Sequence, residues 1–227
     1  LYPRANFLKV VSPLKALQRL AERHRDAFNV PVIGITGSNG KTMVKEWLYQ
    51  LLSPSMVVTR SPRSYNSQIG VPLSVWLMNE ETQVGIFEAG ISQPGEMQAL
   101  RDIIQPTIAV LTNLGAAHQE NFGSMEEKCR QKMLLFHDAH TMVYDADDPI
   151  VAKMAAQLDE KGERLYWSAT DRQAPMFIKG INKGEAATII EYVYKQGKSR
   201  QYTIPYIDEA SITNSIICMA VCLCMGL

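Results

Sequence analysis

A glycine-rich segment carries the residue types that bind phosphate groups. Residues 34–42 read GITGSNGKT, and they follow a β-rich run at 30–36 and precede a helical pattern at 42–52. In a strand, loop and helix of this kind, consecutive backbone N–H groups and the helix dipole favour phosphate. Lys41 would reach the β- and γ-phosphates, and the Thr42 hydroxyl would hold Mg²⁺. The segment therefore predicts a nucleotide-phosphate site.

The loop is a variant of the common phosphate-binding pattern. That pattern has a glycine where this chain has Ile35, and the chain has Gly34 and Gly37 instead. A chance G-x-x-G-x-x-G-K-T turn is the alternative, which the flanking strand and helix disfavour. The candidate nucleotide-binding residues of the loop are Gly37, Ser38, Asn39, Gly40, Lys41 and Thr42.

Two further side chains suit a metal ion. Glu88 follows the apolar run 84–87, and His118 follows the predicted strand 107–111. The carboxyl ends of strands in an open parallel sheet form the edge where ligands bind, and the glycine-rich loop projects from that edge. A carboxylate and a neutral imidazole there would bind Mg²⁺. The alternatives are that Glu88 caps a helix and that His118 is an ordinary loop histidine.

Lys132 occupies an unexpected position on a predicted helix. It falls in register with Met125, Cys129 and Phe136, at the spacing of a single helical face. If Lys132 lies at the edge of this stripe, its ammonium group extends into solvent. If it is partly buried, its pKa is lowered and the neutral amine becomes available for chemistry or modification.

Acidic side chains also follow the predicted strand 142–144. Asp145, Asp147 and Asp148 are candidates for a functional role on that ground. The dipeptide Asp148-Pro149 is also ordinary turn chemistry, so a structural role is the alternative.

Strand and helix patterns alternate along the chain. Apolar runs at 84–87 and 107–111 alternate with helical patterns at 96–104 and 124–136, which indicates a parallel sheet with crossover helices. The predicted fold class is α/β, a P-loop NTPase-like, mostly parallel sheet flanked by helices, with an antiparallel hairpin near the C-terminal edge. Other predicted strands lie at 142–144 and 165–167, the hairpin at 187–194 and 200–204, and other helices at 13–28 and 211–225. The apolar face predicted for the helix 42–52 comprises Val44, Trp47, Leu48, Leu51 and Leu52.

Composition and charge disfavour several classes of protein. Among 227 residues, 23 Lys and Arg balance 23 Asp and Glu, and no block of like charges occurs. Nothing therefore indicates a partner among nucleic acids or anionic membranes, and small or neutral partners are expected. The four cysteines lack C-x-x-C spacing, which fits a reducing, cytoplasmic location. The apolar run 216–227 is too short to span a bilayer and predicts a buried helix.

Five sequence features, taken together in their order along the chain, resemble the Mur ligase family. Its MurF type is the most similar, on the segment after Asn66 and on the H-x-E-x-F-G pattern that begins at His118. The segments KEWLYQLL (45–52) and RSYNSQIGVPLSVW (63–76) are similar to those of Bacteroidetes proteins in which this ligase is fused to alanine racemase. The five features are GITGSNGKT at 34–42, SYNSQIGVPLS at 64–74, FEAG at 87–90, TNLGAAHQENFGS at 112–124, and Lys132.

The resemblance implies an ATP-driven amide ligase that adds D-Ala-D-Ala to UDP-MurNAc-tripeptide through an acyl phosphate, in peptidoglycan precursor synthesis. It implies Glu88 and His118 as Mg²⁺ ligands, and a carbamylated Lys132 that assists a second metal ion. Asn66 matches an asparagine near the γ-phosphate and the acceptor carboxylate. Asn214 matches one that contacts adenine, although the family's preceding histidine and asparagine are here Ala210 and Ser211.

The family also implies three domains. Residues 1–29 resemble a linker or the end of the N-terminal UDP-binding domain, and 30–227 resemble the central ATP-binding domain, with the C-terminal domain absent. We therefore expect weak ATP binding and no ligase turnover from this chain by itself. Three rival interpretations are a ligase of the folylpolyglutamate synthetase type, a regulatory or kinase-like P-loop protein, and a purely structural domain of a fused enzyme.

Overall fold

One nine-stranded sheet organises the computed structural model, which describes residues 6–117, 119–158 and 161–227. The strand order is β2-β3-β1-β4-β5-β6-β7-β8-β9, with parallel pairing from β2 to β7 and antiparallel pairing from β7 to β9. The strands are β1 (Val32–Thr36), β2 (Val58–Arg60), β3 (Val84–Glu88), β4 (Ile108–Leu111), β5 (Thr141–Asp145), β6 (Glu163–Ser168), β7 (Met176–Lys183), β8 (Thr188–Tyr194) and β9 (Ser199–Ile204).

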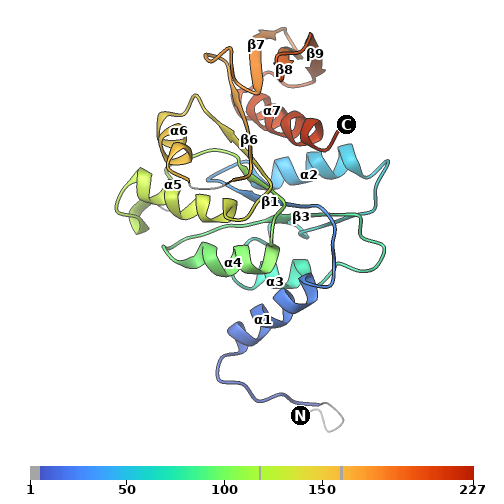
Figure 1. Ribbon diagram of the computed structural model, residues 1–227, viewed down its shortest axis with the longest axis vertical. Helices are drawn as coiled ribbons and strands as arrows, with labels where there is room; N and C mark the ends of the chain where they lie inside the picture. The colour runs from blue at the N-terminus through green and yellow to red at the C-terminus, as the bar shows by residue number, and fades with distance from the viewer. Residues whose placement is uncertain (1–5, 118, 159–160) are drawn as a thin grey trace.

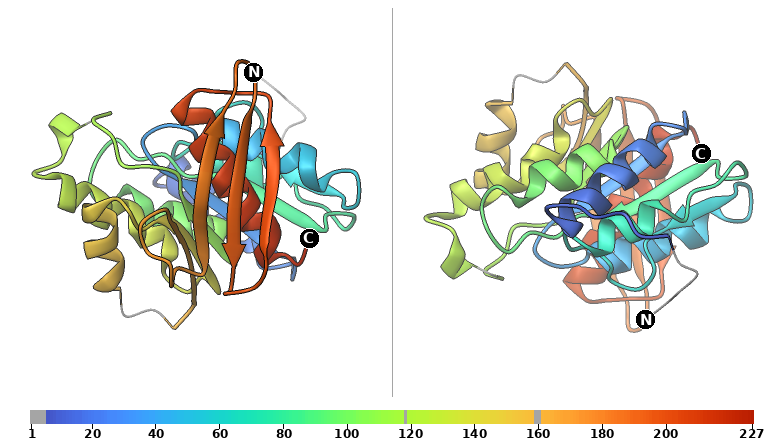
Figure 2. Two further views of the ribbon diagram at one scale, coloured as in Figure 1. Left: turned by 90° about the horizontal axis from the view of Figure 1, so that it is seen from above. Right: turned by 90° about the horizontal axis from the view of Figure 1, so that it is seen from below.

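Helices cover both faces of the sheet (Figure 1). The α2 and α7 helices bury one apolar cluster, and α1, α3, α4, α5 and α6 contribute to the other. The helices are α1 (Pro13–Arg25), α2 (Lys41–Leu52), α3 (Gly70–Val75), α4 (Glu96–Ile104), α5 (Met125–Met133), α6 (Pro149–Ala156) and α7 (Glu209–Cys224), with 3₁₀ turns η1 (Gln119–Asn121) and η2 (Leu134–Phe136). The predicted α/β class with its antiparallel C-terminal hairpin is confirmed (Figure 2).

The predicted apolar face of α2 is partly wrong. Val44, Leu48 and Leu52 are buried as expected, but Leu51 is 54% exposed. Lys45, which is not part of the predicted apolar face, is fully buried. The reason is electrostatic. The ammonium group of Lys45 has a carboxylate and a carbonyl oxygen as partners beneath the helix, and these partners allow a charged side chain on the buried face.

Several elements differ from the sequence pattern, which did not predict β2, α3 or α6. β7 was not predicted as a strand, and it joins β8 to the parallel part of the sheet. The predicted helix 124–136 is α5 followed by η2, and Ser124 caps it by accepting a hydrogen bond from the Glu127 N–H (3.0 Å). The described candidate site residues lie on other parts of the fold: the glycine-rich loop follows β1, Asn66 lies between β2 and α3, and Glu88 ends β3.

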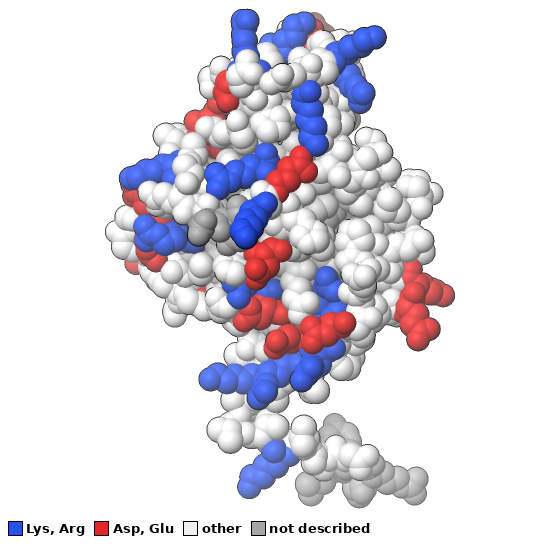
Figure 3. All heavy atoms as spheres, viewed as in Figure 1, with Lys and Arg blue, Asp and Glu red and all other residues white. Residues whose placement is uncertain are grey.

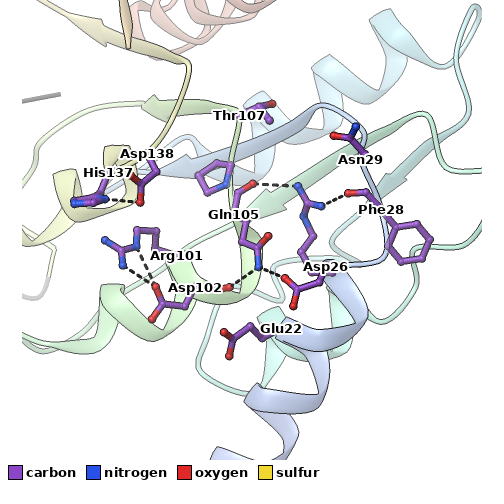
Figure 4. Close-up of a pocket in the computed structure, with 12 residues that line it drawn as sticks. Glu22, Asp26, Phe28, Asn29, Arg101, Asp102, Gln105, Thr107, His137 and Asp138 are labelled. Carbon is purple, nitrogen blue, oxygen red and sulfur yellow. Dashed lines mark hydrogen bonds and ion pairs between the residues drawn. The ribbon is translucent and has the colours of Figure 1, made fainter. Parts of the chain in front are cut away.

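A large hollow of about 590 Å³ lies between α1 and α4. The polar groups that line it hydrogen-bond to one another (Figure 4). The Arg25 guanidinium donates to the carbonyl oxygens of Phe28 and Gln105, and the Gln105 side-chain amide donates to Asp26 (2.8 Å). It borders residues at the starts of strands, such as Thr107 before β4, whereas the phosphate-binding loop follows the end of β1. These contacts anchor α1 to the sheet domain.

No helix among the described residues is long and apolar enough to cross a membrane. On the face drawn in Figure 3, basic side chains predominate at the end that carries β7–β9, and acidic and basic groups are interspersed elsewhere. Lys179 of β7 is paired with Glu191 (3.2 Å), and Lys195, directly after β8, is paired with Glu163 (2.9 Å).

Candidate functional site

The glycine-rich loop depends on two glycines in left-handed backbone conformations. Gly37 has φ +141°, and a Cβ added there would lie 1.9 Å from Thr112 Oγ1. Gly40 has φ +82°, and a Cβ there would lie 2.5 Å from Asn214 Oδ1. Only glycine fits both demands, so the loop geometry requires the predicted residues.

The segment after β4 holds the loop in place. The Ser38 N–H donates to the carbonyl of Asn113 (3.0 Å), and the Asn39 N–H donates to the Asn113 side chain (2.9 Å). The Gly115 N–H donates to Ser38 Oγ (2.9 Å). The N–H groups of the first turn of α2 lack partners within the helix by its geometry, and they form the start of a helix, where anions bind.

Two lysines converge on one carbonyl of this loop. Lys41 Nζ donates to the Gly37 oxygen at 2.8 Å, and Lys132 Nζ donates to the same oxygen at 3.2 Å. Burial lowers the pKa of Lys41, and the nearby Glu88 partly offsets that effect. Two lysine side chains beside a helix N-terminus form an arrangement that suits an anion.

Lys132 is buried rather than directed into solvent. Only 3% of it is exposed. Burial, followed by the neighbouring charges of Lys41 and Lys128, lowers the pKa of Lys132 from 10.5 to about 7. A substantial fraction of this amine is therefore neutral near neutral pH.

Glu88 ends β3 directly beneath the start of α2. Its carboxylate is fully buried, and Oε2 accepts a hydrogen bond from Thr42 Oγ1 (3.0 Å) and a long one from Asn66 Nδ2 (3.5 Å). Oε1 forms an ion pair with Lys45 Nζ (3.0 Å). The structure thus brings together four of the predicted residues, Lys41, Thr42, Asn66 and Glu88, with Lys132 on the other side of Gly37.

The donor set fits Mg²⁺. Among the described residues, no group of three or more His, Cys, Asp and Glu side chains is gathered as a closed metal cage. A hydroxyl and a carboxylate beside a phosphate-binding loop match the way Mg²⁺ binds, with few protein ligands, several waters and the phosphate oxygens of a nucleotide. His118 lies outside the described residues, so its predicted part in this site stays a prediction.

Two cavities flank the loop. One of about 350 Å³ is lined by Lys41, Asn66, Gly90 and Lys132, among others. The second, of about 280 Å³, is bordered by Gly40 and Asn214 and by residues that follow β4 and β5. The loop therefore separates a cationic chamber from a second chamber at the same edge of the sheet.

Residues 35–222 match the family described as the Mur ligase middle domain. The chain belongs to the Mur ligase family. It is 34% identical over 210 residues to the UDP-N-acetylmuramoyl-tripeptide–D-alanyl-D-alanine ligase of Bacillus subtilis, covering 91% of this chain and 44% of that protein. The chain therefore spans less than half the length of this relative.

Solved structures agree with the family and its fold. The MurF ligase of Thermotoga maritima in complex with ADP superposes with a TM-score of 0.84 at 27% identity, covering 100% of this chain and 52% of that one. An FPGS of L. casei superposes with a TM-score of 0.69 at 14% identity, covering 95% of this chain and 62% of that one. At that identity the second likeness concerns the fold alone.

The aspartates after β5 of this Mur ligase domain have separate roles. Asp148 caps α6 by accepting from the N–H groups of Ile150 (2.9 Å) and Val151 (3.1 Å), and Asp147 accepts from Ser168. Asp145 borders the second cavity with Asn214. Burial raises the pKa of Asp145 to about 6. The turn interpretation thus explains Asp147 and Asp148, and Asp145 Oδ1 also accepts a hydrogen bond within this turn, from the Asp147 N–H (2.9 Å).

Two buried lysines of the Mur ligase domain escaped the sequence analysis. Lys45 is paired with Glu88, and Lys128 Nζ donates to the carbonyl oxygens of Gly115 and Ala117. Lys45 lies one helical turn after Lys41, and Lys128 one turn before Lys132. Side chains four residues apart on a helix are neighbours, so this spacing could have predicted that Lys45 lies near Lys41 and that Lys128 lies near Lys132.

Proposed function

We propose that this chain is the ATP-binding core of an ATP-dependent ligase that joins D-Ala-D-Ala to UDP-MurNAc-tripeptide. The observation that carries the proposal is the meeting of Lys41 and Lys132 at the Gly37 carbonyl, beside the buried Thr42–Glu88 pair. The relative from Bacillus subtilis, named for this reaction, supports the choice of substrates.

In the proposed reaction, an oxygen of the tripeptide carboxylate attacks the γ-phosphorus of ATP and ADP leaves. The amine of D-Ala-D-Ala then attacks the acyl carbon, phosphate leaves, and the ammonium proton is lost to solvent. Phosphoryl transfer of this kind needs alignment and neutralised charge rather than a covalent protein nucleophile. A bound Mg²⁺ would supply part of that neutralisation.

The protein's own groups divide this work. Lys41 exchanges its loop carbonyl partners for phosphate oxygens, while Thr42 and Glu88 present the oxygens that hold Mg²⁺. His118 is proposed as a further Mg²⁺ ligand. Asn66, whose amide points to Glu88 from the rim of the cationic chamber, is placed to orient the acceptor carboxylate.

We further propose that the nucleoside part of ATP binds in the second chamber, which Asn214 borders. The Asn214 amide oxygen lies against Gly40, so the position of this side chain, and of a base that it contacts, depends on the geometry of the loop. On this proposal Gly37, Ser38, Asn39 and Gly40 shape the phosphate cradle. The N–H groups of Ser38 and Asn39 already pair with Asn113, which leaves the first turn of α2 as the main source of free donors.

Lys132 is proposed to be carbamylated. Its neutral amine would add to CO₂ with loss of one proton, and the new carboxylate would face Lys41 and help to hold a second metal ion. The lowered pKa of Lys132 favours this step, since only the neutral amine is nucleophilic.

The domain assignment also remains a proposal. It places 1–29 at the end of a UDP-binding domain or its linker, 30–227 in the ATP-binding domain, and the amino-substrate site in a further domain. The full-length protein is proposed to act in the cytoplasm, and its fusion to alanine racemase stays a prediction.

The test uses the full-length protein, ATP, Mg²⁺, UDP-MurNAc-tripeptide and D-Ala-D-Ala, with phosphate release and the amide product measured together. Product formation that Lys41→Ala abolishes is expected. Activity with glutamate and a folate in place of these substrates would favour the folylpolyglutamate synthetase type. ATP hydrolysis without any amide product would favour a switch or kinase-like protein.

A further inference from the structure

Lys45 has an unusual environment for a lysine on the outer layer of a sheet domain. Its side chain is fully buried beneath α2. Four oxygens surround its ammonium group: the carbonyls of Ser61 (2.9 Å) and Arg63, and the carboxylates of Glu46 (3.1 Å) and Glu88 (3.0 Å). Lys45 donates hydrogen bonds to the two carbonyls, whereas it contacts the two carboxylates as ion pairs, and Glu88 Oε1 accepts no hydrogen bond.

The ion pair engages only one oxygen of Glu88. Lys45 Nζ lies 3.0 Å from Oε1 in an ion pair without a hydrogen bond, whereas Oε2 accepts hydrogen bonds from Thr42 Oγ1 (3.0 Å) and Asn66 Nδ2 (3.5 Å). The Glu88 N–H donates to Ser61 Oγ (3.2 Å), so the backbone is tied to the same segment that Lys45 grips. The carboxylate can therefore offer a metal ion a single oxygen.

The number of oxygens that a carboxylate offers affects which divalent cation it suits. Mg²⁺ demands near-ideal octahedral geometry with short bonds and takes single oxygens readily, whereas Ca²⁺ takes more oxygens at longer distances and often both from one carboxylate. A carboxylate with one oxygen occupied therefore favours Mg²⁺. The charge of Lys45 itself repels both divalent ions alike and does not discriminate between them.

We propose that Lys45 is a positioning residue that makes Glu88 a one-oxygen ligand and thereby sets the preference of the nucleotide site for Mg²⁺ over Ca²⁺. This inference rests on the proposed nucleotide function. It differs from a purely structural ion pair, which would hold the 61–63 segment without affecting the choice of cation.

The experiment measures ATP affinity by calorimetry in Mg²⁺, in Ca²⁺ and in EDTA, on the wild-type chain and on Lys45→Met. The wild type is expected to bind ATP roughly tenfold more tightly with Mg²⁺ than with Ca²⁺, and Lys45→Met is expected to reduce that ratio at least about fivefold. Unfolded protein lowers the fraction of binding-competent molecules equally in both cations, so the ratio of the two affinities isolates the positioning role.

Glu46→Gln is the matched control, since it removes the other carboxylate that contacts Lys45 and leaves Glu88 intact. It should keep the wild-type ratio. Lys45→Gln, which also frees Oε1 but keeps a polar end for the Ser61 carbonyl, replaces Lys45→Met if that variant does not fold, with the same expected ratio.

The outcomes separate this inference from the proposed function. A wild type that binds ATP with neither cation contradicts the nucleotide site itself. A wild type that binds Mg²⁺ and Ca²⁺ complexes of ATP equally, or a folded Lys45 variant with an unchanged ratio, overturns the role of Lys45 and leaves the nucleotide site in place.

Discussion

At the scale of single residues, the site gathers buried lysine side chains around the glycine-rich loop, near the buried carboxylate of Glu88. Lys41 and Lys132 share the Gly37 carbonyl, and Lys128 lies close enough to lower the pKa of Lys132 further. Sequence spacing placed Lys132 on a buried stripe, but it could not show the depth of burial, which depends on how α5 packs. The sequence analysis did not single out Lys45, because most of its partners come from segments distant in the chain.

The first prediction concerns Lys132→Met in nucleotide-free protein kept in CO₂-depleted buffer. Because the folded pKa of Lys132 is about 7 and its ordinary value is 10.5, the unfolded chain binds more protons between these values, and wild-type stability rises with pH there. The methionine variant should thus be more stable than wild type by a few kcal/mol at or below pH 7. The gain should shrink as the pH approaches 10. Urea unfolding at several pH values measures it, and a gain independent of pH would contradict the burial argument.

At the scale of elements, a loop with two left-handed glycines and a helix N-terminus forms the functional unit. The sequence predicted the β1–loop–α2 unit because its signals are local, and it predicted β3, β4 and α4 from simple periodicity. It missed the short elements β2, α3 and α6. It also missed β7, whose pairing with β6 involves only a short register, Trp167 with Met176 and Ser168 with Phe177. Long-range pairing of that kind leaves no period in the chain.

The second prediction tests the loop with Gly37→Ala. The added methyl group would meet Thr112 Oγ1 and would hold a strained φ, so the variant should lose roughly 2 kcal/mol or more of stability and most of its ATP affinity. Gly95→Ala is the matched control. Gly95 has φ +83° but open space around it, so the Gly95→Ala variant should lose only about 1 kcal/mol of stability and keep the wild-type ATP affinity. Equal effects of the two changes on stability and binding would show that the close contact with Thr112 is unimportant.

At the scale of the whole molecule, α1 is fastened to the sheet domain by a buried guanidinium. Arg25 is 5% exposed and donates to the carbonyls of Ile104, Gln105 and Phe28. The sequence predicted the helix but not its anchor, because the three acceptors are backbone atoms that no side-chain pattern reveals. The segment 13–25 thus packs on α4 although the family match begins at residue 35.

The third prediction follows from that anchor. Arg25→Met should reduce the free energy of unfolding by about 2–4 kcal/mol, since it leaves buried carbonyls without donors. Arg23→Met on the same helix should change it by less than about 0.5 kcal/mol, because the Arg23 side chain is exposed. Urea unfolding of both variants compares them, and similar losses would mean that α1 is not anchored through Arg25.

The central claim is that the glycine-rich loop and the Thr42–Glu88 pair form a site for ATP with Mg²⁺. Isothermal titration of the wild-type chain and of Lys41→Ala with ATP in the presence of Mg²⁺ tests it most directly. The wild type should bind with a Kd below about 1 mM, and Lys41→Ala should bind at least about tenfold more weakly, since it loses a charge-assisted contact to phosphate. A wild type without measurable binding, or a Lys41→Ala variant that binds as tightly, would contradict the claim.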